Sequence, residues 1–138
     1  MKGYRVEELS LGQSTSLSKT ITETDVYMYA GITGDSNPAH IDSEFARNSM
    51  FGERIAHGML SAGLISAVIG TYLPGPGAIY LGQTLQFTAP VKFGDTITAT
   101  AEVTEINVEK NRIKLKTTCT NQTGKVVIEG EATVMPTT

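Results

Sequence analysis

The sequence predicts an α+β fold in which one curved antiparallel sheet wraps around a central apolar helix. Residues 57–72, HGMLSAGLISAVIGTY, contain no charged side chain and are apolar nearly all round, as expected of a helix buried on most sides. From Asp95 onward the sequence changes to an alternation of apolar and polar residues, which is typical of antiparallel strands with one buried face. Because the helix and the sheet each have an apolar surface to bury, we expect them to pack against each other in one layered domain.

The first expected elements are a strand over residues 14–21 and a helix that follows it. Thr22 can cap this helix, and Asp25, three residues later, completes a weak capping box. Gly31 and Gly34 suggest where the helix ends, because glycine is common just beyond the last helical turn.

A long connection follows over residues 35–56, with a short helix expected at residues 43–48. A connection of this length in a small domain is more often functional than structural filler. After the apolar helix, LPGPG at residues 73–77 interrupts the chain, and residues 78–88 are expected to form another strand.

Three further strands are expected near the end of the chain. The residues predicted to face the core are Ile97, Ala99, Ala101 and Val103 in one strand, and Val126, Ile128, Gly130, Ala132 and Val134 in the last. Residues 111–120 form the strand between them, and Asn121-Gln122-Thr123-Gly124 is a hairpin turn signal.

The connection begins with a chemically rich segment, GDSNPAH at residues 34–40. Asp35 and His40 are residue types that commonly transfer protons, and Asn37 and Pro38 shape the backbone between them. Asp, Ser and Asn also form turns without any chemical role. His40 lies beyond the turn, where turn chemistry does not require a histidine, so the segment is a candidate acid–base site.

Composition limits the possible partners. The 138 residues suit one domain spanning 1–138, and the net charge of −3 argues against nucleic acid as the main partner. No run of eighteen apolar residues suggests a membrane span, and the first residues lack the apolar stretch of a secretory signal. The single cysteine excludes an internal disulfide, so a cytoplasmic protein is expected.

Two other chemistries have less support. Cys119 is a possible nucleophile, but it lies in an alternating segment where a buried strand residue is expected. His40 and His57 are possible metal ligands together with Asp35, but their spacing matches no standard metal-binding pattern. The sequence therefore predicts no metal site.

The segment YAGITGDSNPAHIDSEFA, residues 29–46, closely resembles the signature of R-specific enoyl-CoA hydratases, the MaoC-like hydratase 2 family. The resemblance covers almost the whole chain and includes ERIAHGML at 53–60 and IYLGQTLQFTAPVKFGD at 79–95. It implies the hotdog fold, in which a sheet curls around a central helix. Most hotdog thioesterases lack the GDxNPxH arrangement, so this motif is specific within the fold.

The resemblance also implies a set of site residues. Asp35 and His40 would activate a water molecule, and the N–H of Gly58 would polarise the thioester carbonyl. Gly58 starts the apolar helix, where amide groups are free, but it could instead relieve crowding against the sheet. Supporting roles fall to Asn37 and Ser66, although Ser66 could simply bond a helix carbonyl. The residues proposed for the acyl pocket are Ile65, Ile69 and Thr133, whereas His57 is expected to be structural or to cap the helix.

The implied activity is reversible hydration of trans-2-enoyl-CoA to (R)-3-hydroxyacyl-CoA, within fatty acid or polyhydroxyalkanoate metabolism. No cofactor is expected, because coenzyme A is part of the substrate, and a homodimer or larger homo-oligomer is expected. The alternatives are a 3-hydroxyacyl-[acyl carrier protein] dehydratase, an acyl-CoA thioesterase and a non-catalytic acyl-binding module. Fold similarity cannot separate these classes, so the Asp35–His40 arrangement carries the distinction.

Overall fold

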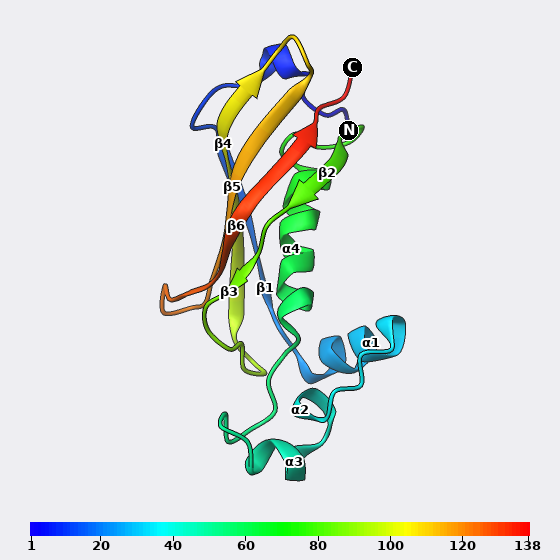
Figure 1. Cartoon of the computed structure of the whole chain (residues 1–138), viewed down its shortest axis with the longest axis vertical. Helices are drawn as coiled ribbons and strands as arrows, with labels where there is room; N and C mark the ends of the chain where they lie inside the picture. Colours follow the sequence, from blue (N-terminus) through cyan, green and yellow to red (C-terminus); the bar gives the residue numbers. More distant parts are fainter.

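A computed structural model describes residues 1–138. The early elements are a 3₁₀ helix η1 (Val6–Glu8), strand β1 (Ser14–Thr20) and helices α1 (Glu23–Thr33), α2 (Pro38–Ile41), α3 (Ser43–Arg47) and α4 (Gly58–Thr71). The later elements are strands β2 (Ile79–Gln83), β3 (Gln86–Phe87), β4 (Thr96–Asn107), β5 (Arg112–Thr120) and β6 (Val126–Met135) (Figure 1). None of the helices is long and apolar enough to cross a membrane.

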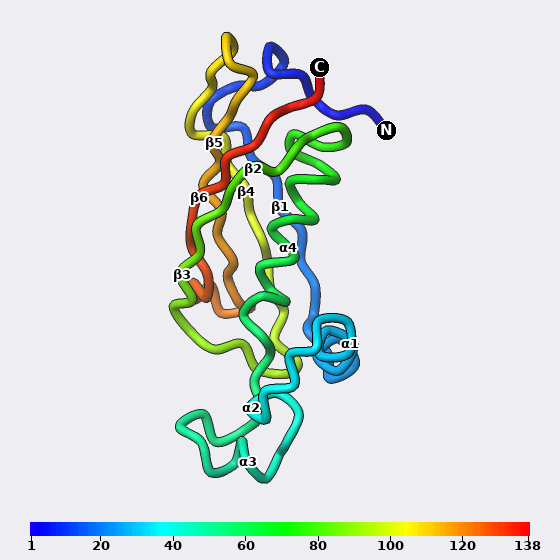
Figure 2. Tube along the Cα trace, turned by 45° about the vertical axis from the view of Figure 1, so that its right-hand side comes forward, coloured from blue at the N-terminus to red at the C-terminus, as the bar shows by residue number.

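The strands form one antiparallel sheet in the order β1-β4-β5-β6-β2, with β3 also paired to β6. Helix α4 lies along one face of this sheet and contacts β1, β4, β5 and β6 (Figures 1 and 2). Helices α1, α2 and α3 gather beyond the start of α4, at one end of the molecule (Figure 2). The predicted α+β arrangement is confirmed, and the short helices at this end position the site.

Helix α1 begins and ends where its capping residues predict. Thr22 accepts a hydrogen bond from the backbone N–H of Asp25, whose carboxylate accepts one from the N–H of Thr22. Gly34 ends the helix with a φ of 81°, a left-handed conformation that glycine adopts without steric cost. The chain leaves the helical path at this turn, so Asp35 follows the helix and is not part of it.

The alternation predicted for β4 is confirmed, but the prediction for β6 is wrong near its start. Val127 was expected to face solvent, yet it is 1% exposed, whereas Val126 is 37% exposed. The pairing of β5 with β6 shifts register between Cys119 and Thr120. Such an irregularity re-aims neighbouring side chains. It brings Val127 and Ile128 both into the interior.

Residues 78–88 form two strands instead of the single strand expected. Both β2 and β3 pair with β6, and the chain crosses Gly130 between them. A Cβ atom at Gly130 would stand 1.8 Å from the carbonyl oxygen of Thr84, so only glycine permits this crossing. The break lets β3 carry Phe87 toward the start of α4.

Helix α4 is covered on one side only, which corrects the expectation that it is buried on most sides. Its buried residues face the sheet: Ser61, Ala62, Ile65, Val68 and Ile69. Gly63, Ser66 and Gly70 are exposed on the opposite side. The single chain therefore leaves one uncharged side of α4 open to solvent.

Cys119 is buried on β5, as expected, with its thiol directed at the carbonyl of Ser61. Burial raises the pKa of this thiol to about 12, so almost none of it is thiolate at neutral pH. We expect no reaction of the native protein with a disulfide reagent such as DTNB at pH 8, and one thiol titrated after unfolding in guanidinium. Rapid labelling of the native protein would contradict this burial.

Candidate active site

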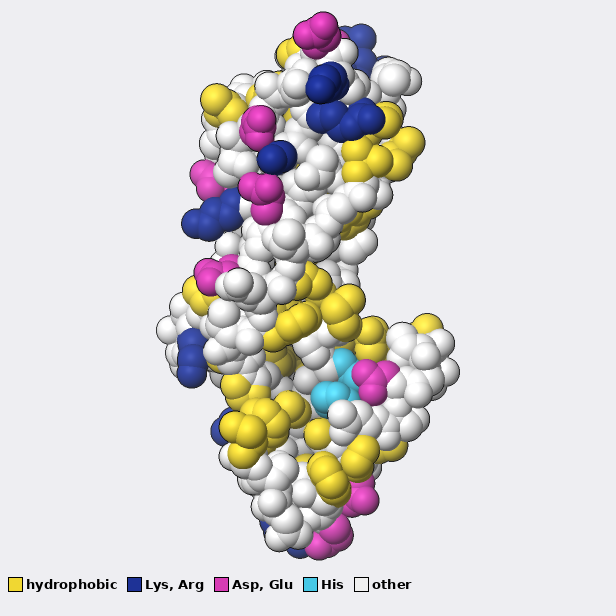
Figure 3. Space-filling view, viewed as in Figure 1, with side chains coloured by type: hydrophobic (Ala, Val, Ile, Leu, Met, Phe, Trp, Pro, Cys, Tyr) yellow, Lys and Arg dark blue, Asp and Glu magenta, His cyan; other side chains and the backbone are white.

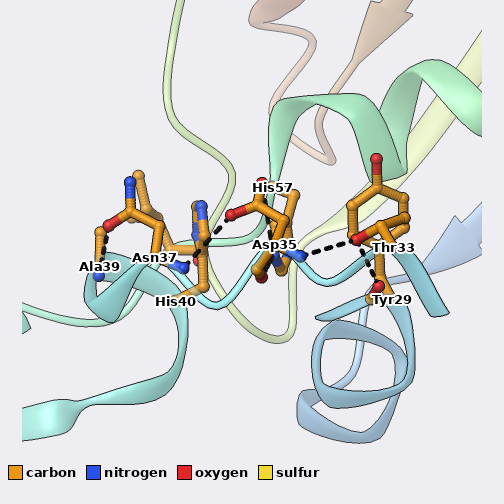
Figure 4. Close-up of polar contacts among 8 residues, drawn as sticks. Tyr29, Thr33, Asp35, Asn37, Ala39, His40 and His57 are labelled. Atoms are coloured by element: carbon orange, nitrogen blue, oxygen red, sulfur yellow. Dashed lines mark hydrogen bonds and ion pairs between the residues drawn. The ribbon is translucent and has the colours of Figure 1, made fainter. Parts of the chain in front are cut away.

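Asp35 is held by local hydrogen bonds directly after α1. Its backbone N–H donates to Thr33 Oγ1 at 3.1 Å, and the Thr33 hydroxyl donates to the carbonyl of Tyr29 at 2.8 Å (Figure 4). The Asp35 carboxylate accepts a hydrogen bond from the N–H of Asn37 at 3.2 Å. These bonds fix the residue while leaving half of its side chain exposed.

His40 belongs to α2, a four-residue helix within the long connection that was not predicted from the sequence. Asn37 occupies its N-cap and accepts a hydrogen bond from the N–H of Ala39, and Pro38 is its first residue. Asn followed by Pro is a favourable helix start, because the asparagine satisfies a free amide and proline fixes the first φ angle. This pair was the available signal for α2. The helix turns His40 back toward Asp35.

One ring nitrogen of His40 is fixed by the backbone. Nδ1 lies 2.7 Å from the carbonyl oxygen of Ile55. Because a carbonyl oxygen only accepts, Nδ1 carries the hydrogen, and in the neutral ring Nε2 keeps a free lone pair. His40 therefore presents a basic nitrogen, and its ring orientation is set by a residue from another part of the chain.

His57 lies beneath the Asp35–His40 pair and is 2% exposed. Its Nε2 atom is 3.0 Å from the backbone carbonyl oxygen of Asp35, and its ring stacks on that of His40 with centroids 3.8 Å apart. The expected capping role is wrong in its chemistry: His57 occupies the N-cap position of α4, but its side chain makes no capping hydrogen bond. It contacts both candidate catalytic residues instead.

Gly58 is the first residue of α4, so its N–H has no acceptor within the helix. The positive end of the helix dipole lies at the same place. A Cβ atom at Gly58 would stand 2.5 Å from Cδ1 of Phe87. The glycine thus leaves an amide and a narrow free space beside an aromatic ring.

These residues surround a cavity of about 440 Å³. Asp35, His40, His57 and Gly58 line it together with an apolar wall. The wall consists mainly of Phe51, Ile55, Ala56, Met59, Phe87, Ala89, Pro90, Val91, Val127 and Ile128. Figure 3 shows the histidine and acidic side chains in a hollow bordered by hydrophobic ones. Such a cavity suits a substrate with an apolar chain and a polar reacting group.

Several predicted site residues lie elsewhere. Ser66 is exposed on the open side of α4, and Ile65 and Ile69 are in the core, each 1% exposed. Thr133 is half-buried on β6 and is not part of the cavity wall. Their assignment to active-site support or an acyl pocket stays a prediction. The observed wall comes from β3, from the start of β6 and from segments before and after α4, none of which was predicted as an acyl pocket.

The structure gathers three potential metal ligands, although their sequence spacing argued against a shared site. Ligand atoms of Asp35, His40 and His57 all lie within 4.8 Å of one another. An imidazole binds a metal through a lone pair in the plane of its ring. The two rings are stacked at 28° between their planes, so their lone pairs do not converge on one point. The arrangement favours proton transfer over metal binding.

Comparisons with known proteins identify the family. A model described as "MaoC like domain" matches residues 8–126. The chain is 60% identical over 129 residues to the (R)-specific enoyl-CoA hydratase of Rhodospirillum rubrum, covering 94% of this chain and 89% of that protein. It is 50% identical over 128 residues to the 3-hydroxybutyryl-CoA dehydratase of Methylorubrum extorquens, covering 93% and 81%.

The same family is found among solved structures. The unliganded R-hydratase PhaJ1 from Pseudomonas aeruginosa superposes with a TM-score of 0.92 at 49% identity, covering 99% of this chain and 88% of that chain. This similarity confirms the hotdog fold that the sequence resemblance implies, with α4 as its central helix. The chain belongs to the MaoC-like domain family.

Proposed function

We propose that this protein is an (R)-specific enoyl-CoA hydratase, which reversibly hydrates trans-2-enoyl-CoA to (R)-3-hydroxyacyl-CoA. One observation carries the proposal: Asp35, His40 and Gly58, the first residue of α4, line one cavity with an apolar wall. The names of the similar proteins from Rhodospirillum rubrum and Methylorubrum extorquens support it. The protein is an enzyme of this hydratase type.

The proposed reaction divides its steps among these groups. His40 Nε2 takes a proton from the water that attacks C3, while the Asp35 carboxylate holds the other hydrogen of that water. The C2–C3 π electrons move toward the thioester, whose oxygen gains enolate charge. The Gly58 N–H, at the positive end of α4, stabilises that charge. A proton passed back from the His40–Asp35 pair to C2 completes the addition of water.

No metal or organic cofactor enters these steps, so we expect hydration of crotonyl-CoA in the presence of a chelator. The assay follows loss of enoyl absorbance together with free thiol, and chiral analysis of the product checks the R configuration. Asp35→Asn serves as the control for contaminating activity. Loss of activity in the chelator, restored by a metal ion, would contradict the cofactor-free mechanism.

The same assay separates the alternatives. Release of free thiol would show thioester hydrolysis, because hydration leaves the thioester intact. Turnover of an enoyl group only when it is attached to acyl carrier protein would show a dehydratase for that carrier. Binding of enoyl-CoA without turnover would show an acyl-binding module. Hydration of crotonyl-CoA without thiol release supports the proposal.

We also propose that the protein is at least a homodimer, joined through the open side of α4 and the edge strand β2. Strand β2 ends the sheet and carries exposed apolar residues, Ile79 at 54% and Leu81 at 46%. Exposed edges invite pairing, and pairing of two identical edges closes a symmetric dimer. The exposed glycines Gly63 and Gly70 would allow close approach of a second helix.

Light scattering is expected to give at least twice the 14.7 kDa mass of one chain. Leu81→Lys should shift this equilibrium toward monomer, because a charge on the edge strand opposes pairing. Val108→Lys, a charge at a residue that is 55% exposed outside the strands, is the matched control and should leave the mass unchanged. A fully active protein at the mass of a single chain would rule out this assembly.

A further inference from the structure

We propose that His57 is a positioning residue: its buried imidazole holds the backbone of Asp35 with one edge and the ring of His40 with one face. The inference rests on the proposed hydratase function. In this proposal one side chain, that of His57, keeps Asp35 and His40 in the correct relative position. His57 itself does not transfer a proton in this proposal.

The edge contact is a hydrogen bond. His57 Nε2 lies 3.0 Å from the backbone carbonyl oxygen of Asp35, and because that oxygen only accepts, Nε2 carries the hydrogen. The other hydrogen bonds of Asp35 reach only Thr33 and Asn37, both two residues away. His57 is therefore the side chain that ties Asp35 to the central helix, across 22 positions of sequence.

The face contact fixes His40. The two rings are stacked with centroids 3.8 Å apart, while His40 Nδ1 is held by the carbonyl of Ile55. One bond along its edge and one ring against its face leave the His40 imidazole little freedom to tilt. Tyr29 covers His57 in turn, with ring centroids 4.6 Å apart. The ring contacts thus run from Tyr29 in α1 through His57 to His40 at the cavity.

A purely structural role explains His57 poorly. Its Nδ1 atom is buried without a hydrogen-bond partner, and such an atom costs stability that an apolar side chain would avoid. The side chain does not cap α4 either. A buried residue that carries an unpaired nitrogen, yet contacts both members of the acid–base pair, is better explained by what its Nε2–H and ring face do for the site.

The test compares two substitutions of similar size. In His57→Gln the side-chain amide can place a donor near the position of Nε2, whereas His57→Leu fills the space without a donor. We expect His57→Leu to lower kcat for crotonyl-CoA by roughly tenfold to a hundredfold, the scale of a small misplacement of catalytic groups. KM should change less than kcat, the melting temperature should stay near wild type, and His57→Gln should recover several-fold of the lost kcat.

Ser61→Ala is the matched control. The Ser61 hydroxyl is also buried on α4 without a partner, but Ser61 does not line the cavity, so kcat should be unchanged. Wild-type kcat in His57→Leu would overturn the proposal, and so would a His57→Gln variant as slow as His57→Leu. A wild-type protein that hydrates no enoyl thioester would instead refute the proposed function.

A second measurement does not depend on activity. Nitrogen-15 NMR of the wild-type histidines should show one imidazole as the Nε2–H tautomer with a hydrogen protected from solvent, and His57→Gln should remove that signal. His40 should show the opposite tautomer, with the hydrogen on Nδ1. A His57 ring with its hydrogen on Nδ1 would overturn the proposed bond to Asp35.

Discussion

Asp35→Asn and His40→Ala are each expected to lower kcat for hydration of crotonyl-CoA by at least about a hundredfold, the usual scale for a general acid–base group. The asparagine side chain keeps an oxygen that can accept the hydrogen bond from the N–H of Asn37, but it loses the negative charge. The alanine loses the free Nε2 lone pair. Both changes remove a proton-transfer group from the cavity and leave the hydrophobic core unchanged.

The double variant, Asp35→Asn with His40→Ala, tests more directly than either single variant whether the two residues act together. If the two residues act on one water molecule, removing the second should cost far less than removing the first, so the combined loss should be much smaller than the product. Steady-state kinetics of the four proteins measures this, with melting temperatures as the check on folding. Losses that multiply would show independent action, and wild-type kcat in either single variant would remove that residue from the mechanism.

Glu53→Gln is the matched control for these substitutions. Glu53 is an exposed acid in the same connection, 3.9 Å from the Lys92 amine, and it does not line the cavity. Its neutralisation should leave kcat unchanged. A large loss in this variant would show that the connection responds to any change of charge, and the Asp35 result would then carry no information about proton transfer.

The local part of the site was predictable from the sequence because its residues are close neighbours in the chain. Asp35 and His40 are five positions apart, with a proline between them, so any compact path brings them near each other. Both residues line one cavity in the structure. Helix α2 was missed because four residues are too few to show a helical period, and only the Asn37–Pro38 pair marks its start.

The cavity wall could not be predicted because it depends on long-range packing. Phe87, Val127 and Ile128 reach the site only after β3 and β6 pair. The orientation of Val127 follows from a register shift that no local alternation reveals. Ile65 and Ile69 are in the core, each 1% exposed, and their place in an acyl pocket stays a prediction.

Residues 55–58, around the start of α4, link the predicted Asp35–His40 pair to the cavity wall that could not be predicted. The Ile55 carbonyl orients His40, the His57 ring holds Asp35, and Gly58 lines the same cavity. Ala56, between them, is fixed to the segment that precedes β4 by its N–H, which donates to the carbonyl of Val91 at 2.8 Å. Four consecutive residues thus align the groups that the reaction requires.

Gly58→Ala is the second substitution with a large expected effect. If the Gly58 N–H stabilises the thioester oxygen, an added methyl group would obstruct the approach of the substrate, and kcat should fall about ten- to a hundredfold, toward the loss seen when an oxyanion donor is removed. The melting temperature should stay near wild type. Alanine favours a helix over glycine by up to about 1 kcal/mol, which offsets part of any crowding.

The structure identifies what the methyl group would meet. Its position is 2.5 Å and 2.6 Å from ring carbons of Phe87, a residue that is 52% exposed on the two-residue strand β3. A ring at the surface can turn aside, whereas a clash with the sheet would cost about 1–3 kcal/mol of stability. Phe87→Leu removes the crowding without touching the amide, so it provides the matched background for the test.

The double variant Gly58→Ala with Phe87→Leu therefore separates the two roles of the glycine. If Gly58 serves only packing against Phe87, removing the ring should restore both melting temperature and kcat to the values of Phe87→Leu alone. If its amide binds the thioester oxygen, kcat should stay low although the crowding is gone. A destabilised Gly58→Ala protein that keeps full specific activity in its folded fraction would assign the glycine to packing, and the donor for the enolate oxygen would have to be sought elsewhere in the cavity.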